Sequence, residues 1–532
     1  MEEKGPFTAS GIPLKAVYAA QDIAGLEPGL PGQPPYVRGA YPRMYQERPW
    51  RIKQIYGCGT VEESRQRGLW LREQGQETVN FFVSGPFYTL YDPDDPEMAP
   101  YREDMGILSG AASLQDLDSL LEGVDLGKTY VSCFATPQTS PLSYACLFSL
   151  AEKRGVPLSQ LSGTGMNDLL LAYLCCPAKD QVPPRAALRL VADTIEYCAQ
   201  NAPRFMAHCF SGNDIRETGC NAYQELALIL ANAISLIDEL LGRGKLPLDS
   251  FAYQLATVSL NGDRDFFEEV AKFRAARRLW CWLLKERYGA REERSWRLRI
   301  HVETAGSSLT YQQPLNNIVR VAYQVLAAAL GGVQSISADS YDEPFAFPSQ
   351  ESALLALRTH HIAQAETNIT AVADPLGGSY YVEWLTGELE RRARDYLAEI
   401  EARGGFLAAM ESGWLHQELM KAMWDEERKV EKGEKKVVGV NHFPSQGEAP
   451  PLPLFEPNPR LWEIARDRLE RLRRERDGQK LALALEELRQ AARGQQNIMP
   501  AMIRAAQAYA TPGDIGKAFR EVFSTWKPPF PI

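Results

Sequence analysis

Several features that mark common protein classes are missing from this sequence of 532 residues. The nine cysteines include an adjacent pair, Cys175–Cys176, but no C-x-x-C motif and no disulfide-framework spacing, so we expect reduced thiols in a cytoplasmic protein. No apolar run approaches the roughly 18 residues of a membrane span, and the N-terminus Met-Glu-Glu-Lys has no signal-peptide pattern. The 58 Lys and Arg against 68 Asp and Glu give a net charge of −10, which argues against a bulk nucleic-acid binder.

The sequence also lacks the motifs of the commonest enzyme chemistries. None of the six histidines stands in an H-E-x-x-H pattern or at zinc-ligand spacing with cysteines, so no metal site is expected. His208 and Cys209 are adjacent on a predicted strand, where we expect them to pack in the core. The absence of Walker, G-x-S-x-G and G-x-G-x-x-G motifs excludes a conventional kinase, hydrolase or dehydrogenase.

The chain does contain an alternation of short apolar runs and amphipathic stretches over residues 51–390. Its length exceeds the roughly 250–300 residues at which a single core stops growing, so more than one folded unit is expected. The alternation predicts an α/β fold, a (β/α)8 TIM barrel, with an open doubly wound sheet as the alternative. The strand candidates are Thr78–Ser84, Thr129–Thr136, Leu158–Thr164, Arg204–Ser211, Phe251–Leu260, Arg297–Thr304, Val333–Ala338 and Asn368–Val372. The clearest helical patterns are Arg185–Gln200, Asn221–Leu241, Asp265–Glu286, Asn316–Leu330 and Glu351–Ala365.

Regions of different composition flank the predicted barrel. Residues 1–50 are rich in Pro and Gly and predict an extended N-terminal arm that lies on its own barrel or on a partner subunit. Residues 391–443 predict a charged helical extension, and the prolines of residues 444–460 predict a semi-rigid linker. Residues 461–532 predict a C-terminal helical region of two or three helices.

Three segments combine residue types that can bind a nucleotide. Tyr41-Pro-Arg-Met-Tyr45 and Arg48-Pro-Trp-Arg-Ile-Lys-Gln54 place aromatic rings among cations, which suits stacking on a base and contact with phosphates. Ser211–Gly219 and Gln334–Glu343 place polar and acidic side chains at the ends of predicted strands. Taken alone, a packed arm, helix caps and surface acids explain these segments about as well.

The same segments belong to a longer series of motifs that runs along the chain. The series comprises Tyr-Pro-x-Met-Tyr-x-x-Arg-Pro-Trp at 41–50, Thr-Val-Glu-Glu-Ser at 60–64, Thr-Gly-Met-Asn-Asp at 164–168, Ser-Gly at 211–212, Glu217-Thr-Gly219, Glu-Val-Ala-Lys-Phe-Arg-Ala-Ala-Arg-Arg-Leu-Trp at 269–280, Thr-Ala-Gly-Ser-Ser-Leu-Thr at 304–310, Asn-Asn-Ile-Val-Arg at 316–320, Gln334-Ser335 and Ala-Asp-Pro-Leu-Gly-Gly-Ser at 373–379. In this order they resemble the large subunit of the methylmalonyl-CoA mutase family, the adenosylcobalamin-dependent acyl-CoA mutases. The resemblance implies a (β/α)8 barrel threaded by the pantetheine arm of CoA and a radical migration of the thioester carbonyl group.

The resemblance also implies roles for individual residues. The positions that resemble the CoA site are Tyr41, Arg43, Met44, Arg51, Lys53, Gln54, Thr164 and Arg204. The positions that resemble the family's carboxylates near the corrin and the adenosyl ribose are Glu217, Glu303, Asp339 and Glu343, where Asp339 replaces an Asn.

The family's cobalamin domain carries a D-x-H-x-x-G motif, which this sequence lacks. We therefore expect adenosylcobalamin to be bound jointly with a separate small subunit that carries the motif. A hetero-oligomer, or a homodimer of large subunits, is expected, and a G-protein metallochaperone is a candidate further partner.

Departures from the family pattern concern the substrate. Ile55 and Cys176 replace the Tyr and Arg that hold the methylmalonyl group, and Met166 replaces a Gln. Phe82 stands at a position that is small in methylmalonyl-CoA mutases, and Gln254 replaces a CoA-contacting Arg. Loss of the guanidinium would leave a substrate carboxylate unpaired, which disfavours a dicarboxylic substrate unless another cation such as Arg216 moves in.

The catalytic positions differ as well. Asn213 and Asp214 replace a Tyr-His pair near the thioester carbonyl and are the candidate catalytic residues. We expect a neutral branched acyl-CoA, isobutyryl- or 2-hydroxyisobutyryl-like, although 2-hydroxyisobutyryl-CoA mutases pair the equivalent of Ile55 with an Asp at the position of Phe82. The alternatives are a methylmalonyl-CoA mutase proper and a non-catalytic paralogue that acts as a scaffold or regulatory partner.

Overall fold

The computed structural model describes residues 6–54, 57, 59–83, 88–107, 111–445 and 452–529. By their internal contacts the residues form two compact units, each assembled from separate stretches of chain. Unit 1 comprises Met1–Gln54, Ser211–Ser235 and Ala256–Phe455, and unit 2 comprises Ile55–Phe210, Leu236–Leu255 and Glu456–Ile532. The domain boundaries expected from composition remain predictions.

Unit 1 is built on a parallel sheet. The strands follow the order β1-β9-β8-β7-β6, with β6 (Phe210–Ser211) at one edge. Strand β1 (Arg51–Ile52) pairs in parallel with β9 (Ser335–Ser337), β9 with β8 (Arg299–Thr304), and β8 with β7 (Thr257–Gly262). This register places Ser259, His301 and Ser335 side by side.

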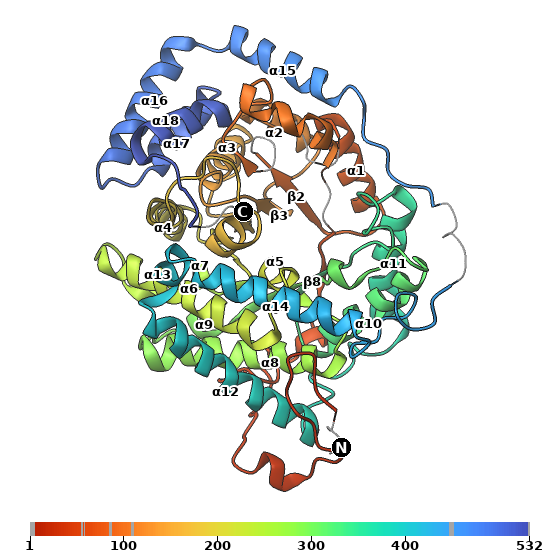
Figure 1. The fold of residues 1–532 in the computed structure, drawn as a ribbon. Coiled ribbons are helices and arrows are strands. Elements are labelled where there is room, and N and C mark those ends of the chain that lie inside the picture. The colour runs from red at the N-terminus through yellow and green to blue at the C-terminus, as the bar shows by residue number, and fades with distance from the viewer. Residues whose placement is uncertain are drawn as a thin grey trace. The chain divides into compact units, whose positions relative to one another are not determined.

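Unit 2 contains a second parallel sheet. Its strand order is β2 (Thr78–Phe82), β3 (Tyr130–Phe134), β4 (Ser162–Met166) and β5 (Phe205–Met206). The register places Asn80, Ser132 and Thr164 side by side. Both sheets are thus made of short strands that are joined through helices, and the predicted α/β class is confirmed (Figure 1).

The helices have the lengths that the amphipathic stretches predict. In unit 1 they are α5 (Gly212–Glu217), α8 (Phe266–Cys281), α9 (Glu293–Trp296), α10 (Asn316–Leu330), α11 (Gln350–Glu366), α12 (Tyr380–Ala402), α13 (Gly405–Glu411) and α14 (Trp414–Glu431). In unit 2 they are α1 (Val61–Glu73), α2 (Leu114–Leu120), α3 (Ser140–Lys153), α4 (Pro184–Asn201), α7 (Leu248–Leu255), α15 (Leu461–Glu475), α16 (Gly478–Arg493), α17 (Met499–Gln507) and α18 (Pro512–Phe523). Helix α6 (Ala222–Gly242) contributes to both units.

Several expected elements differ from the structure. The first half of the candidate strand Phe251–Leu260 is helix α7, because Phe251, Ala252 and Leu255 are buried at helical spacing. Asn368–Val372 forms turns, and the positive φ angles of Asn368 (61°) and Asp374 (49°) interrupt an extended run. The described part of residues 461–532 holds four helices, not two or three.

Each sheet has one apolar face that packs in a hydrophobic core. In unit 1 this face carries Val258, Leu260, Ile300, Val302 and Ile336, all buried. In unit 2 the core face carries Val79, Phe81, Val131 and Cys133, and Gly165 lets α3 approach. A Cβ on Gly165 would overlap the hydroxyl of Tyr144, so this helix seats directly on the strand.

The N-terminal arm lies on unit 1. The buried guanidinium of Arg277 in α8 donates to the carbonyls of Tyr36 and Val37, both at 2.8 Å. Arg38 pairs with Asp374 at 2.8 Å, and the ring of Tyr18 contacts Trp384 of α12. Of the two expected positions of the arm, the structure therefore shows contact with its own chain.

No helix in the described ranges is both long enough and apolar enough to cross a membrane.

Candidate functional site

The strand faces opposite the apolar cores are polar and buried. In unit 2, Asn80, Ser132 and Thr164 form a row across neighbouring strands. Within the described part of the chain, the hydroxyls of Ser132 and Thr164 have no hydrogen-bond partner. An ordinary (β/α)8 barrel fills this position with bulky branched side chains. Small polar residues there leave donors and acceptors for a polar ligand.

Unit 1 repeats this arrangement. Ser259, His301 and Ser335 form a buried or half-buried row, in which Nδ1 of His301 lies 2.9 Å from Oγ of Ser335. The hydroxyl of Ser259 has no partner among the residues described. Burial and the nearby charge of Lys53 lower the pKa of His301 below its ordinary value, although the contact with Glu303 acts in the opposite direction. The imidazole is therefore neutral at pH 7 and offers one donor and one acceptor.

Four carboxyl groups gather at the carboxyl ends of the unit 1 strands. Glu303 ends β8, Asp339 follows β9, Glu217 ends α5, and Glu343 lies one turn beyond Asp339. Asn213 Nδ2 donates to Glu303 Oε2 at 2.9 Å, and the backbone N–H of Ser307 donates to Glu217 Oε2 at 2.8 Å. The structure thus brings together the four carboxylates that the resemblance implied.

The shifted pKa values show that these groups act on one another. Desolvation, followed by the negative charges of Glu343, Glu217 and Glu303, raises the pKa of Asp339 well above its ordinary value. The pKa of Glu343 is raised to about 7 by desolvation and by Asp342, Glu217 and Glu303. Because Glu343 is exposed, we give the neighbouring charges more weight than desolvation. With a pKa of about 7, Glu343 is protonated in part at neutral pH.

The free acceptor atoms of the cluster fit a ligand that is rich in hydroxyl and amide donors. Asp339 Oδ2, Glu303 Oε1, Asn213 Oδ1 and Asn261 Oδ1 are buried and accept no hydrogen bond from any described residue. Carboxylate and amide oxygens in this state favour O–H or N–H groups such as those of a ribose or a corrin side chain. The donor set is not that of a metal site, since no group of three His, Cys, Asp or Glu residues within the described ranges is placed to hold an ion.

A buried cluster of ion pairs contacts Asn261, which binds Glu217 of the carboxylate cluster. Lys272 of α8 lies 2.7 Å from carboxylate oxygens of both Glu225 and Glu269, and it donates to the carbonyl of Asn261 at 2.8 Å. Glu225 accepts the backbone N–H of Asn261 at 2.9 Å. Asn261 in turn donates to Glu217 at 2.5 Å, so the ion cluster fixes the position of that carboxylate.

A cavity of unit 1 lies where the N-terminal arm meets the amino ends of β1, β8 and β9. It has a volume of about 260 Å³ and is lined by Tyr41, Met44, Tyr45, Glu47, Arg48, Pro49, Trp50, Arg51, Arg299, Val333 and Gln334. Arg297 lies over the ring of Tyr41, at 5.3 Å from its centroid. An aromatic face with three arginines around one cavity suits a base and its phosphates.

The predicted CoA residues fall into two groups. Tyr41, Met44 and Arg51 line this cavity, whereas Arg43 is 65% exposed and faces Glu47 at 3.9 Å. Lys53 and Gln54 are buried beyond the end of β1, where Gln54 exchanges hydrogen bonds with the backbone of Ala338 at 2.8 and 3.0 Å. Arg204 is exposed at the amino end of β5 in unit 2.

The carboxyl ends of β3 and β4 in unit 2 form an apolar cluster. Phe134, Met166 and Leu171 pack together there, with Tyr88 against them. Phe134 and Leu171 were not expected at the site, because an apolar residue at a strand end cannot be told from the core in the sequence. Phe134, Met166, Leu171 and Tyr88 present uncharged side chains.

The other predicted substrate residues of unit 2 lie apart from the cluster or outside the description. Ile55 lies outside the described residues, as does the side chain of Phe82 on β2. Cys176 is exposed directly after the π-helical turn Leu171–Cys175. Gln254 is buried and accepts the backbone N–H of Ala207 at 2.9 Å, which is a structural role.

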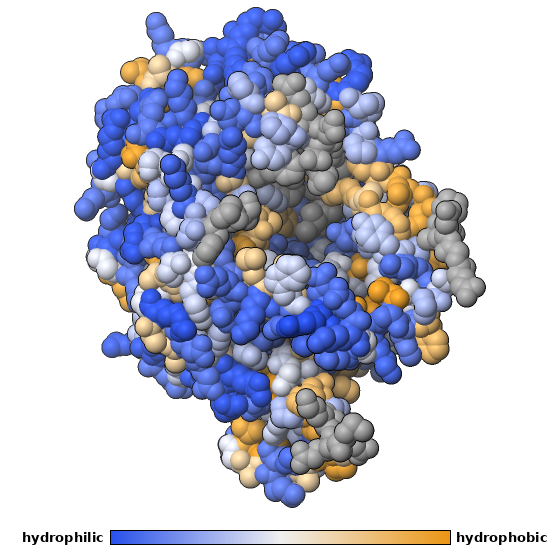
Figure 2. Space-filling model, in the orientation of Figure 1, coloured by the Kyte–Doolittle hydropathy of each residue, from blue (hydrophilic) through white to orange (hydrophobic). Residues whose placement is uncertain are grey.

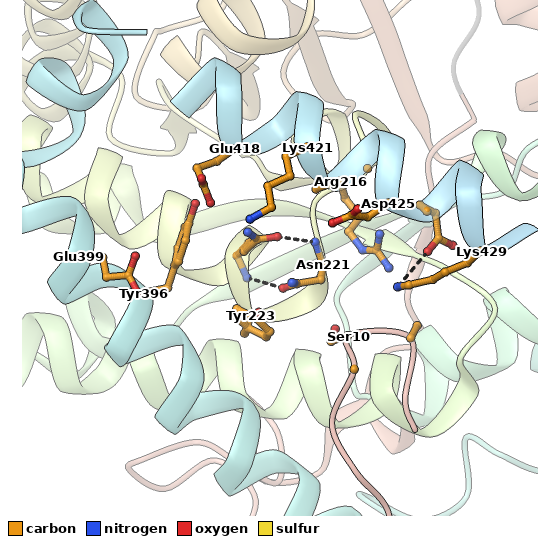
Figure 3. Close-up of a pocket in the computed structure, with 16 residues that line it drawn as sticks. Ser10, Arg216, Asn221, Tyr223, Tyr396, Glu399, Glu418, Lys421, Asp425 and Lys429 are labelled. Carbon is orange, nitrogen blue, oxygen red and sulfur yellow. Dashed lines mark hydrogen bonds and ion pairs between the residues drawn. The ribbon is translucent and has the colours of Figure 1, made fainter. Parts of the chain in front are cut away.

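Arg216, the cation that could replace the missing guanidinium, is already engaged. It donates to the carbonyl of Cys220 at 2.6 Å and to Asp263 at 3.2 Å. Figure 3 shows it in a polar pocket beneath α14, beside Asn221 and Asp425. The candidate catalytic residues Asn213 and Asp214 lie in the same helix, α5, where Asn213 Nδ2 donates to Glu303 Oε2.

Three further polar residues of the site were also missed at the level of sequence. Asn261, His301 and Arg299 are single polar residues within strand segments, and no local motif marks them. The signal that could have found them is their alternation, because each belongs to the polar face of a strand whose other face is apolar.

The chain is similar in sequence to known acyl-CoA mutases. The family model described as methylmalonyl-CoA mutase matches residues 7–525. The chain is 38% identical to the 2-hydroxyisobutanoyl-CoA mutase large subunit of Aquincola tertiaricarbonis, over 99% of this chain and 93% of that protein. It is 36% identical to the methylmalonyl-CoA mutase of Cereibacter sphaeroides and 35% identical to that of Escherichia coli, over 97% and 98% of this chain and 72% of each relative.

Proposed function

The chain belongs to the methylmalonyl-CoA mutase family, and from this premise we propose that it is the large subunit of an adenosylcobalamin-dependent acyl-CoA mutase. The reaction is the 1,2-migration of the thioester carbonyl group on a neutral, branched acyl-CoA, isobutyryl- or 2-hydroxyisobutyryl-like. We place the enzyme in the cytoplasm, in keeping with the eight described cysteines, which are free thiols.

The observation that carries the choice of substrate is the apolar cluster of unit 2. Phe134, Met166 and Leu171 offer the acyl group only hydrocarbon, thioether and aromatic surface. A second carboxylate placed against them would lose its hydration without gaining a cation, which costs several kcal/mol. A methyl-branched neutral acyl group loses nothing by the same transfer.

The cavity lined by Tyr41, Arg51 and Arg299 is our proposed site for the nucleotide end of CoA. The polar row of unit 1 supplies hydrogen-bond partners for the amides and hydroxyl of the pantetheine arm. The hydroxyl of Ser259 has no partner among the described residues, and the neutral imidazole of His301 provides a further donor or acceptor.

The carboxylate cluster of unit 1 is our proposed cofactor side. Adenosylcobalamin, when bound, supplies the radical chemistry of the migration. Asp339 and Glu303 have free acceptor atoms for ribose hydroxyls, and Glu217 is held by Asn261 and Ser307 in a fixed position. Asn213 orients Glu303, and Asp214, the next residue of α5, is our proposed catalytic carboxyl group. A protonated carboxyl within the cluster can donate a hydrogen bond as well as accept one.

A separate small subunit with a D-x-H-x-x-G motif is the proposed partner. The chain has no such motif, and the relative that it covers to 93% is itself named a large subunit. The alternative of methylmalonyl-CoA mutase activity is weakened by Arg216, whose guanidinium is engaged with Asp263 and Cys220. The alternative of a non-catalytic scaffold does not account for the free acceptors of the cofactor side.

The deciding experiment is turnover of a panel of acyl-CoA esters by the chain reconstituted with its small subunit and adenosylcobalamin. We expect turnover of isobutyryl-, 2-hydroxyisobutyryl- or larger branched esters and none of methylmalonyl-CoA. The variant Phe134→Ala should shift kcat/KM about tenfold toward a longer acyl chain, since it removes a ring from the apolar cluster.

Turnover of methylmalonyl-CoA that is abolished by Arg216→Ala would instead establish the methylmalonyl alternative. Absence of turnover for every ester, together with absence of CoA-ester binding by calorimetry, would overturn the proposed function altogether.

A further inference from the structure

Helix α10 of unit 1 has an unusual composition for a helix on the outside of an α/β unit. Arg320 is the only charged residue among its 15 residues. A solvent-facing helix normally carries charged side chains on its outer face. Here the outer face instead carries Leu315, Val319 and Tyr323 at successive spacings of four residues, and they are 54%, 53% and 62% exposed.

The segment after α14 extends this apolar surface. Val438, Val440 and Phe443 are 42%, 37% and 72% exposed. The segment is fixed beside α10, because Arg320 donates to the carbonyl of Val438 at 2.7 Å and Gln313 donates to the carbonyl of Phe443 at 3.0 Å. We call the combined surface the α10 face, and its members are Leu315, Val319, Tyr323, Val438, Val440 and Phe443.

The α10 face exposes a large apolar area and little charge. Six half-exposed side chains of this size present about 500 Å² of apolar area, near the upper limit for monomeric proteins, where such patches are usually functional. The one cation within it, Arg320, turns its guanidinium to Asn317 and Thr310 and not to solvent. Figure 2 shows hydrophobic side chains gathered on the side of the molecule where Figure 1 labels α10 and α11.

The α10 face is continuous with the cofactor side. The turn Gly306–Ser308 follows β8, and the backbone N–H of Ser307 binds Glu217. A Cβ on Gly306 would lie 3.5 Å from Asp339 Oδ2, so the turn touches the carboxylate cluster itself. The chain then runs through Tyr311, which is 60% exposed and packs on Phe345, directly into α10. A partner that reaches the cluster from the carboxyl end of the strands meets this surface next.

We propose that the α10 face is the docking surface for the cobalamin-carrying small subunit. The proposal rests on the proposed function, which requires that subunit, and adds where on the chain it is held. The partner is expected to present an apolar surface to Val319 and Tyr323, since the six members of the α10 face are uncharged.

The test is the variant Val319→Glu, which places a charge at the centre of the α10 face without touching the core. The matched control is Leu483→Glu on α16, where an apolar side chain that is 69% exposed lies on a different unit. Affinity for the small subunit of the same organism, recognised by its D-x-H-x-x-G sequence, is measured by biolayer interferometry. The mass of the large subunit alone is measured by light scattering, and isobutyryl-CoA binding by calorimetry.

We expect Val319→Glu to weaken the small-subunit complex at least tenfold, while Leu483→Glu binds as the wild type does and both variants keep wild-type affinity for isobutyryl-CoA. Equal small-subunit affinity in all three proteins would overturn the proposal. Loss of self-association in Val319→Glu with an unchanged small-subunit affinity would overturn it in favour of a second copy of this chain. Failure of the wild type to bind isobutyryl-CoA would count against the proposed function and not against the surface alone.

Discussion

The buried ion cluster behind Asn261 shows how single residues set the charge of the site. Lys272 and Arg216 bring two positive charges, and Glu225, Glu269 and Asp263 bring three carboxyl groups. Nearby cations hold the pKa of Asp263 well below its ordinary value, whereas burial raises that of Glu269 to about 7. At a pKa of about 7, Glu269 is partly protonated at neutral pH, which reduces its repulsion by Glu225 and Asp263.

This partial protonation predicts a pH dependence of stability. The pKa of Glu269 is about 7 in the folded chain against 4.5 for an unperturbed glutamate, so the unfolded chain binds fewer protons between these values. The free energy of unfolding should then fall as the pH rises from 5 to 8. In Glu269→Gln this fall should be smaller by about 2 kcal/mol, measured by urea unfolding at both pH values.

The comparison of wild type with variant isolates Glu269 from Asp92, whose pKa is also raised, to about 6, by burial in unit 2. Identical pH slopes in the two proteins would show that Glu269 is already ionised in the fold.

At the level of residues, the sequence indicated which carboxylates lie near one another. It did not indicate the residues that hold those carboxylates in place. Glu217, Glu303 and Asp339 could be placed because they match motifs of a family. Asn261 and Lys272, which hold Glu217, act through backbone groups, and hydrogen bonds to backbone leave no mark on residue spacing. Arg43 matched the family as well, yet it faces Glu47 and solvent, because a match in sequence does not fix the direction of a long side chain.

Among the elements, α14 packs closely against the backbone of a glycine. Gly219 follows α5 with a φ of +102°, and a Cβ there would lie 2.7 Å from the Cα of Met423 in α14. The absence of a side chain thus allows the two backbones to touch.

We expect Gly219→Ala to lower the free energy of unfolding by about 1–3 kcal/mol, because both the backbone angle and the contact with α14 resist a methyl group. Proteolytic cleavage within Trp414–Glu431 should become faster, which limited trypsin digestion can follow. Gly242→Ala is the control, since nothing lies within 4 Å of its Cβ position at the end of α6. Equal melting temperatures for the two variants would contradict a tight seat for α14.

Long amphipathic elements were predictable, and short ones were not. Asn316–Leu330 is a helix with the expected ends, because its apolar period runs for four turns without a break. The expected strand Arg204–Ser211 is two strands of two residues, Phe205–Met206 and Phe210–Ser211, on different sheets. Which neighbour a two-residue strand pairs with depends on tertiary contacts, and local sequence does not contain them.

For the molecule as a whole, the arm couples distant parts of the chain to the proposed CoA cavity. Tyr41 and Met44 line that cavity, but the segment before them is held by Arg277, more than 230 positions later. The guanidinium has two carbonyl partners in the arm and is fully buried, so its loss leaves both acceptors unsatisfied.

Arg277→Met should therefore weaken CoA-ester binding about tenfold, although Arg277 does not line the cavity. Arg278→Met on the same helix is the control, because Arg278 faces Glu390 of α12 at 3.4 Å and not the arm. Calorimetric titration with isobutyryl-CoA measures both variants. If both bind as tightly as the wild type, the arm does not shape the cavity.

The alternation of strands and helices made the α/β class predictable for most of the chain. The division into two units was not predictable, because each unit joins stretches that are far apart in the sequence, such as Ser211–Ser235 and Ala256–Phe455. Such a division depends on which surfaces pack against one another. Composition indicates only how much apolar surface the chain can bury.

The polar rows on the strand faces have a consequence for the enzyme before its substrate arrives. The hydroxyls of Ser132 and Thr164 in unit 2 are buried without a hydrogen-bond partner among the described residues, and such groups are ordinarily hydrated. A ligand with amides and hydroxyls along its length can take the place of that water one hydrogen bond at a time. Only a ligand as long as the pantetheine arm would displace all of this water. Exclusion of water from the reaction site therefore requires CoA itself and not the acyl group alone.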